Sequence, residues 1–233
     1  MNQSSVQSMK RRWQSFAESD PTFYIATRAQ PWKIEEFFAS GQSLVEEVNR
    51  WIGEDSPRRR MLEIGCGLGR TAVHFATHFE QVDAVDISQV MIENARSFKP
   101  PANVRFMVCS GCDLAAFADD SMDLVASFLV FQHVEDEQVI AAYLREIARV
   151  LKAAGRAVLQ FDTRPRRLIL DLYKSLPDPL LPRAHRRCIR RYRRDPDALS
   201  RLFQSANLRI IDDRGPRTAE HVFLLGPMQD RDP

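Results

Sequence analysis

Apolar residues along this chain follow two alternating patterns, which predict a succession of strands and helices. Short apolar runs that end in glycine or polar residues predict five buried strands, at 61–64, 82–86, 104–109, 122–127 and 157–161. Apolar residues at helical spacing predict helices at 71–79, 89–98 and 137–151. Ser88 is the expected N-cap of the second helix, and Gly155 marks the expected end of the third. Strands that alternate with helices favour an α/β fold with a parallel sheet covered on both faces.

The two ends of the chain add further elements to this alternation. The N-terminal part predicts a polar helix at 6–17 and helical spacing across 34–52. The C-terminal part predicts a helix at 196–206, followed by strands at 208–212 and 221–225 that extend the same sheet. We therefore expect an N-terminal helical extension at 1–57 and one domain at 58–233.

The composition excludes several classes of protein. The chain has 233 residues, of which 44% are hydrophobic and 27% charged, so bulk disorder is excluded. Its apolar runs fall far short of the ~20 residues of a membrane-spanning helix, and residues 1–20 lack the apolar core of a secretory signal. Four cysteines do not make a disulfide scaffold, so we expect a reducing, cytoplasmic location.

The charge is distributed unevenly along the chain. Residues 164–194 contain eleven arginines and lysines but only two acids, whereas the formal net charge of the whole chain is +2. Such a basic segment attracts anionic partners, although a solvated helix face has the same composition. We expect residues 164–194 to be an insertion or cover after the fifth strand, beside the site.

The strongest chemical signal is a glycine loop directly after the first predicted strand. Gly65, Gly67 and Gly69 follow an apolar run and precede a helix, so the backbone there turns tightly and a ligand can approach it closely. The spacing is G-x-G-x-G, which differs from the G-x-G-x-x-G of dinucleotide binders. Glu63, just before the loop, would repel a pyrophosphate and suits a cationic ligand instead.

Further polar residues follow the next three strands. Asp86 ends the second strand, where a carboxylate can accept both hydroxyls of a ribose. Asp113 and Leu114 follow the third strand, and an acid beside an apolar side chain suits an adenine ring. The fourth strand leads into Phe128 and His133. Because the carboxyl ends of parallel strands meet at one sheet edge, we expect these residues to form one site.

The order and spacing of these motifs resemble the class I S-adenosylmethionine-dependent methyltransferases of the small-molecule type. The resemblance rests on LEIGCGLGR, VDAVDIS, SGCDLAAFADDSMDLVASF, FQHV and YLREIARVLKAAGRAVLQF, over about residues 60–162. It implies a Rossmann-like, doubly wound sheet of seven strands, mostly parallel with the last strand antiparallel. It also implies S-adenosylmethionine as the methyl donor, S-adenosylhomocysteine as the product, and no metal.

The resemblance also assigns roles to individual residues. It implies that the cofactor is bound by Glu63, Gly65, Cys66, Gly67, Gly69, Asp86, Ile87, Met91, Asp113, Leu114, Phe128 and His133. It implies that the extension at 1–57 covers the cofactor, and on the acceptor side it suggests Tyr24, Trp32 and Arg164. His133 is the candidate catalytic residue, because a neutral imidazole there could take a proton from a hydroxyl acceptor. An equally weighted interpretation is that His133 only packs against or orients the cofactor loop.

The sequence leaves three functions open. The first is methyl transfer to a small molecule at oxygen, nitrogen or carbon. The second is methylation of RNA or another macromolecule bound by the arginine-rich residues 183–194, which is less favoured because aromatic residues between the arginines are limited to Tyr192. The third is a non-catalytic scaffold or regulator that binds the cofactor. Cys109 and Cys112 lack the second ligand pair that a zinc site needs.

Overall fold

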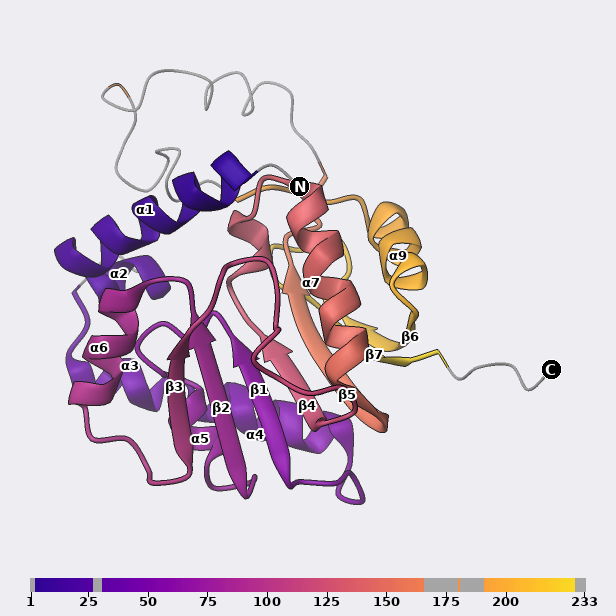
Figure 1. Ribbon diagram of the computed structural model, residues 1–233, viewed down its shortest axis with the longest axis horizontal. Helices are drawn as coiled ribbons and strands as arrows, with labels where there is room; N and C mark the ends of the chain where they lie inside the picture. The colour runs from indigo at the N-terminus through magenta and orange to yellow at the C-terminus, as the bar shows by residue number, and fades with distance from the viewer. Residues whose placement is uncertain (1–2, 27–30, 166–179, 181–190, 229–233) are drawn as a thin grey trace.

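The computed structural model describes residues 3–26, 31–165, 180 and 191–228. Seven strands form one sheet in the order β3-β2-β1-β4-β5-β7-β6 (Figure 1). The strands are β1 (Arg60–Ile64), β2 (Gln81–Asp86), β3 (Val104–Val108), β4 (Met122–Ser127), β5 (Leu151–Phe161), β6 (Leu208–Arg214) and β7 (His221–Pro227). The first five strands pair in parallel, and β7 runs antiparallel to both β5 and β6. The predicted doubly wound sheet with an antiparallel last strand is therefore confirmed.

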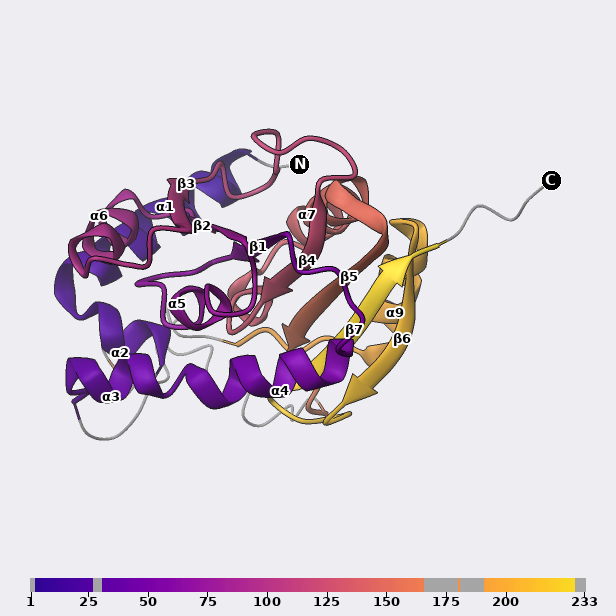
Figure 2. The same cartoon turned by 90° about the horizontal axis from the view of Figure 1, so that it is seen from below.

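Helices cover both faces of this sheet. One face packs against α4 (Gln42–Ile52), α5 (Ala72–Phe75) and α6 (Gln89–Ser97), and the other against α7 (Glu137–Val150) and α9 (Pro196–Ser205). Figure 2 shows α4 lying along one face as far as β6 and β7. All six residues of β4 are buried, as expected of a central strand between two helical layers.

Local sequence signals explain where several helices begin. Ser88 caps α6 by accepting a hydrogen bond from the Met91 amide, as predicted. Asp136 and Asp195 cap α7 and α9 in the same way, and Pro196 occupies the first turn of α9. The apolar residues of α7 form one buried stripe that includes Ile140, Leu144 and Ile147, so the helix packs on the sheet.

The N-terminal helices lie at the carboxyl edge of the parallel strands. They are α1 (Gln3–Ser19), α2 (Pro21–Ile25) and α3 (Ile34–Ala39). Figure 1 shows α1 crossing above the ends of β1, β2 and β3. The Ser88 hydroxyl donates to the Gln14 side chain at 3.1 Å, which ties α1 to the start of α6. The extension thus covers the sheet edge where the predicted site lies.

Two local predictions are wrong. The helix expected at 71–79 is α-helical only over Ala72–Phe75, and the Asn103 amide instead binds the carbonyl groups of Ala76 and Phe79. Gly155 does not end α7 but lies inside β5, which begins immediately after that helix. A Cβ atom at Gly155 would stand 2.9 Å from the carbonyl oxygens of Lys152 and Met122, so close backbone approach explains the glycine.

Candidate functional site

Two pockets meet at the carboxyl edge of the sheet. The first, called here the loop pocket, has a volume of about 80 Å³ and is bounded by the glycine loop, the end of β2 and the N-terminal helices. The second, called here the outer pocket, has a volume of about 560 Å³ and lies between α4 and the β6–β7 end of the sheet. Phe128 and Leu129, directly after β4, line both pockets. The two pockets therefore adjoin at these two residues.

The glycine loop requires glycine at three positions. Gly65, Gly67 and Gly69 have φ angles of +74°, +54° and +83°, in the left-handed region that other residues rarely adopt. The amides of Gly65 and Cys66 both donate to the Val85 carbonyl oxygen, at 2.7 and 3.0 Å, which fixes the loop to β2. Gly65 and Gly67 line the loop pocket, whereas Cys66 is buried beside it and is not among its lining residues.

Asp86 connects the glycine loop to the start of α6. Its Oδ2 atom accepts a hydrogen bond from the Gly67 amide at 3.0 Å, and its Oδ1 atom accepts one from the Ser88 amide at 2.8 Å. Burial raises the pKa of this carboxyl, and the two amide donors oppose the increase. The carboxylate lines the loop pocket, next to Ile87 and Met91. Its remaining lone pairs can accept hydrogen bonds from a ligand in that pocket.

Glu63 is a buried acid, and one of its two carboxylate oxygens has no hydrogen-bond partner among the described residues. Its side chain accepts a hydrogen bond from the Thr71 hydroxyl, while its Oε2 atom is buried with no hydrogen-bond partner. Burial raises the pKa of this carboxyl to about 7, although Thr71 and Arg70 lower it in part. A buried acceptor without a donor is unfavourable. An ammonium group at the glycine loop would correct this defect, so Glu63 fits a cationic ligand.

Five of the twelve predicted cofactor-binding residues do not line the loop pocket: Glu63, Cys66, Gly69, Asp113 and Leu114. Asp113 binds within its own turn, accepting from the Ser110 hydroxyl at 2.7 Å and from the Ala115 amide at 3.2 Å. Leu114 is buried in the core beneath α7, and its amide donates to Glu146. Neither residue lines the pocket, nor does Gly69, whose missing Cβ makes room for the Phe106 ring.

The turn after β4 carries strain at the wall shared by the pockets. Leu129 has a φ angle of +61°, which is costly for a residue with a Cβ atom. Its amide donates to the Gln160 side-chain oxygen at 3.3 Å, which helps to hold this conformation. Strained backbone of this kind gathers at functional sites, where the surrounding structure enforces it.

His133 lies in the loop pocket beneath the first helix. Its Nε2 atom is 3.1 Å from the Gln132 side-chain nitrogen, which donates to it, and its ring contacts the Trp13 ring edge-on at 5.6 Å. An imidazole nitrogen that accepts from an amide is neutral at that atom. The contacts of His133 therefore join the β4 turn to α1.

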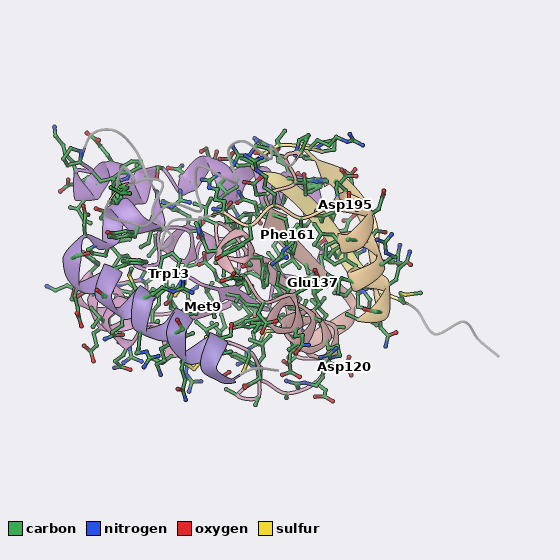
Figure 3. All side chains as sticks on the ribbon, turned by 90° about the horizontal axis from the view of Figure 1, so that it is seen from above. Met9, Trp13, Asp120, Glu137, Phe161 and Asp195 are labelled. Carbon is green, nitrogen blue, oxygen red and sulfur yellow. The ribbon has the colours of Figure 1, made fainter. Side chains whose placement is uncertain are left out.

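The N-terminal helices close the loop pocket from above. Met9 and Trp13 from α1, and Tyr24 and Ile25 from α2, line it. Figure 3 labels Met9 and Trp13 on α1. A Cβ atom at Gly67 would stand 2.6 Å from the Ile25 side chain, so α2 rests directly on the glycine loop. Tyr24 was predicted on the acceptor side but lines the loop pocket. Met9, Trp13 and Ile25 were not predicted as site residues. In the sequence, Met9 and Trp13 are distinguished only as apolar residues in a largely polar helix.

The other two predicted acceptor-side residues lie in different places. Trp32 lines the outer pocket, and its ring nitrogen donates to the Ala26 carbonyl oxygen at 2.6 Å. Arg164 instead forms a two-pronged ion pair with Asp162, at 2.6 and 3.0 Å, and lines neither pocket. Most of the basic segment lies outside the described residues. Its end returns to the site, since the Tyr192 amide donates to the Gln132 carbonyl oxygen and Arg191 lines the outer pocket.

The part of the chain that the structure describes contains neither a candidate metal site nor a candidate membrane-spanning helix. Within it, no three His, Cys, Asp or Glu side chains are grouped so that they could hold a metal ion. None of the helices described there combines the length and apolar character that crossing a membrane requires.

Comparison with known proteins agrees with this geometry. Residues 62–159 match the model of a family described as a methyltransferase domain. That span runs from β1 to β5 and contains the glycine loop, Asp86 and the turn after β4. The match therefore covers the strands whose ends form the loop pocket.

Named relatives include methyltransferases of different kinds. An uncharacterized methyltransferase of Bacillus subtilis, YcgJ, is 33% identical over 150 residues, which are 63% of this chain and 57% of that protein. The chain thus spans little more than half of that relative's length. The tRNA 5-carboxymethoxyuridine methyltransferase of Escherichia coli K12 is 26% identical over 198 residues, covering 81% of this chain and 74% of the relative.

Solved structures share the fold over most of the chain. The magnesium protoporphyrin IX methyltransferase of Synechocystis, solved with S-adenosylhomocysteine, superimposes with a TM-score of 0.66 at 18% identity. The superposition covers 94% of this chain and 99% of that one.

Proposed function

We propose, from the membership of this chain in the class I S-adenosylmethionine-dependent methyltransferase family, that it transfers a methyl group from S-adenosylmethionine to a small-molecule acceptor. The observation that carries this proposal is the shared wall at Phe128 and Leu129. It brings a pocket suited to the methyl donor against a second pocket suited to an acceptor. Such an arrangement would place the methyl carbon and the acceptor atom in line where the two pockets adjoin.

The residues of the loop pocket fit the methyl donor. Asp86, which lines the pocket, would accept hydrogen bonds from the ribose hydroxyls. Glu63 does not line the pocket but is buried directly before the glycine loop, where its partnerless Oε2 atom would accept from the ammonium group. Gly65 and Gly67 would let the backbone approach the methionine portion, beside Phe128. When bound, the cofactor supplies a methyl group activated by a positively charged sulfur. Ile87 and Met91, which line the same pocket, are proposed to border the adenosine. Asp113 and Leu114, expected beside the adenine ring, do not line this pocket.

The protein's own contribution is alignment and exclusion of water. Trp13 and Ile25 close the loop pocket, so a ligand there is removed from solvent. Holding two reactants in line can supply ~7–11 kcal/mol of the activation free energy. The loop pocket of about 80 Å³ is narrow, so we propose that α1 and α2 shift outward when the cofactor enters. The extension at 1–57 would thus act as a cover on the domain at 58–233.

Calorimetry with three ligands tests the proposed function. S-adenosylmethionine and S-adenosylhomocysteine are expected to bind, because Glu63 and the G-x-G-x-G loop favour an ammonium group and a ribose. NAD is expected not to bind, because Glu63 repels its pyrophosphate. Binding of NAD alone would refute the assignment of the loop pocket.

The affinity for S-adenosylhomocysteine is expected to depend on Glu63 ionisation. The Glu63 carboxyl has a pKa of about 7, and an ammonium group binds only its ionised form. Below that pKa each binding event releases a proton, so the affinity should fall by up to about tenfold per pH unit. Glu63→Gln should bind more weakly and lose this dependence. The check is calorimetry at several pH values below about 7, where the ligand's own amino group stays charged. An unchanged pH profile in the variant would refute the role of Glu63.

His133 remains the candidate for acceptor-side chemistry, and its contacts favour a positioning role. Replacing it with alanine removes the ring contact with Trp13 and the bond from Gln132. We expect His133→Ala to raise the KM for S-adenosylmethionine and leave kcat nearly unchanged at saturation. A general base gives the opposite result, a kcat reduced by ~10²–10⁴-fold and loss of the acidic limb of the pH profile. Steady-state kinetics across pH distinguish the two.

RNA is the second candidate acceptor. It is favoured by the E. coli relative named for tRNA and by the eleven basic residues of 164–194. Labelled S-adenosylmethionine and fractionated cell extract would separate the candidates by the fraction that takes the label. No label in any fraction, despite cofactor binding, would favour the non-catalytic alternative. A cytoplasmic location remains a prediction.

A further inference from the structure

The outer pocket contains a buried polar group that nothing in the described structure satisfies. Gln160 lies on β5, is only 5% exposed and lines the pocket. Its side-chain nitrogen is buried without a hydrogen-bond partner. Leaving a buried donor unpaired is costly, so such a group in a pocket indicates the place of a ligand acceptor atom.

The orientation of the Gln160 amide is fixed by its neighbour. The Leu129 backbone amide can only donate, and it donates to the Gln160 oxygen at 3.3 Å. The oxygen therefore faces the Leu129 turn, and the NH₂ group points elsewhere. Because Leu129 lines both pockets, the Gln160 NH₂ group lies near the place where the two pockets adjoin and the methyl group would be transferred.

One arginine of the outer pocket has no hydrogen bond or ion pair to a described residue. Arg214 pairs with Glu47 at 2.9 Å and stacks on Trp51, and Arg70 donates to the Ser40 carbonyl and hydroxyl oxygens. Arg191 also lines the pocket, and its side chain makes no hydrogen bond or ion pair with any residue that the structure describes. Despite burial, the pKa of the Asp162 carboxyl is lowered by its pairing with Arg164 and, to a smaller extent, by the charge of Arg191. Glu220 also lines the outer pocket, but its side chain is exposed at the rim.

We propose that the acceptor is a carboxylic acid whose carboxylate binds between Gln160 and Arg191 and takes the methyl group. This inference rests on the proposed function. A carboxylate accepts from an amide NH₂ and from a guanidinium together, whereas a neutral acceptor would form only the weaker hydrogen bonds of an uncharged group with Arg191. Trp32, Leu44 and Val48 in the same pocket would contact the apolar body of the acid.

The transfer to a carboxylate balances without a base. One carboxylate oxygen forms a bond to the methyl carbon, and the bond from that carbon to sulfur breaks. The bonding electron pair goes to sulfur, which becomes the neutral thioether of S-adenosylhomocysteine. No proton moves, since a carboxylate is already ionised near pH 7. The methyl ester product is uncharged and loses its attraction to Arg191, which favours its release.

Matched probes test the carboxylate site. Benzoate and octanoate are titrated into the protein saturated with S-adenosylhomocysteine, beside benzamide and octanamide. We expect each acid to bind at least about tenfold more tightly than its amide. Gln160→Glu keeps an acceptor for the Leu129 amide but removes the donor, so it should abolish this preference. Arg191→Gln should also reduce it, whereas Arg193→Gln, a control whose side chain binds the Pro165 carbonyl oxygen, should not.

The outcomes separate this inference from the proposed function. Failure of S-adenosylhomocysteine to bind would contradict the proposed function. Its normal binding, with acids and amides bound equally or not at all, would overturn only the carboxylate site. With methyl-labelled cofactor and cell extract, alkali should release the label as methanol, as methyl esters do. Label confined to alkali-stable products would overturn transfer to the carboxylate, whereas no label in any fraction would contradict the proposed function itself.

Discussion

Asp86→Ala is expected to weaken binding of S-adenosylhomocysteine by about 100-fold or more. The carboxylate is proposed to hold the ribose, and hydrogen bonds to charged groups are each worth ~1.5–3 kcal/mol. The same carboxylate accepts from the amides of Gly67 and Ser88, so its loss also loosens the glycine loop. We therefore expect the free energy of unfolding to fall as well, by ~1–3 kcal/mol.

A graded series separates these two effects of Asp86. Asp86→Asn keeps one oxygen to accept from Gly67 or Ser88, so it should retain more stability than the alanine variant while still binding the cofactor weakly. Asp197→Ala, in the first turn of α9 and away from both pockets, is the control for loss of one acid. Calorimetry gives the affinity and urea unfolding gives the stability. Normal affinity in Asp86→Ala would show that another residue holds the ribose.

The sheet was predictable because its buried strands are nearly continuous apolar runs. β4, with every residue buried, is the clearest case. The first half of β5 was not predicted, because its residues do not form a continuous apolar run. Lys152 and Arg156 are partly exposed there, so the apolar pattern begins only at Ala157. Gly155 then looks like a helix end, although it permits close approach of the Met122 carbonyl.

The candidate site was predictable where it depends on the order of the strands. The glycine loop and Asp86 each end a strand, and the ends of β1 and β2 are neighbours in the sheet. The cover was expected from the resemblance, but the residues through which it lines the pocket were not predictable, because Trp13 reaches the loop pocket through packing between distant segments. Gln160 was missed because a single polar residue in an apolar strand becomes informative only when its partners are known.

Gly65→Ala is expected to lower the free energy of unfolding by ~2–4 kcal/mol, from two separate causes. Gly65 has a φ angle of +74°, and a left-handed conformation costs ~1–2 kcal/mol for a residue with a Cβ atom. The new Cβ atom would also stand 2.2 Å from a methyl carbon of Val130, and such overpacking costs ~1–3 kcal/mol. Because Gly65 lines the loop pocket, cofactor affinity should fall together with stability.

Two further variants separate the cost of overpacking from the cost of backbone strain. Val130→Ala removes the overlapping methyl groups, so adding it to Gly65→Ala should restore ~1–3 kcal/mol and give a favourable coupling energy in a double-mutant cycle. The backbone strain stays in both variants. Gly53 has a φ angle of +89° with nothing within 4 Å of a Cβ atom, so Gly53→Ala should show the strain alone. Unfolding in urea measures all five proteins, and equal losses for Gly65→Ala and Gly53→Ala would show that Val130 moves aside freely. Unequal losses that Val130→Ala repairs would show that the β4 turn is held rigidly against the glycine loop, as alignment of two reactants requires.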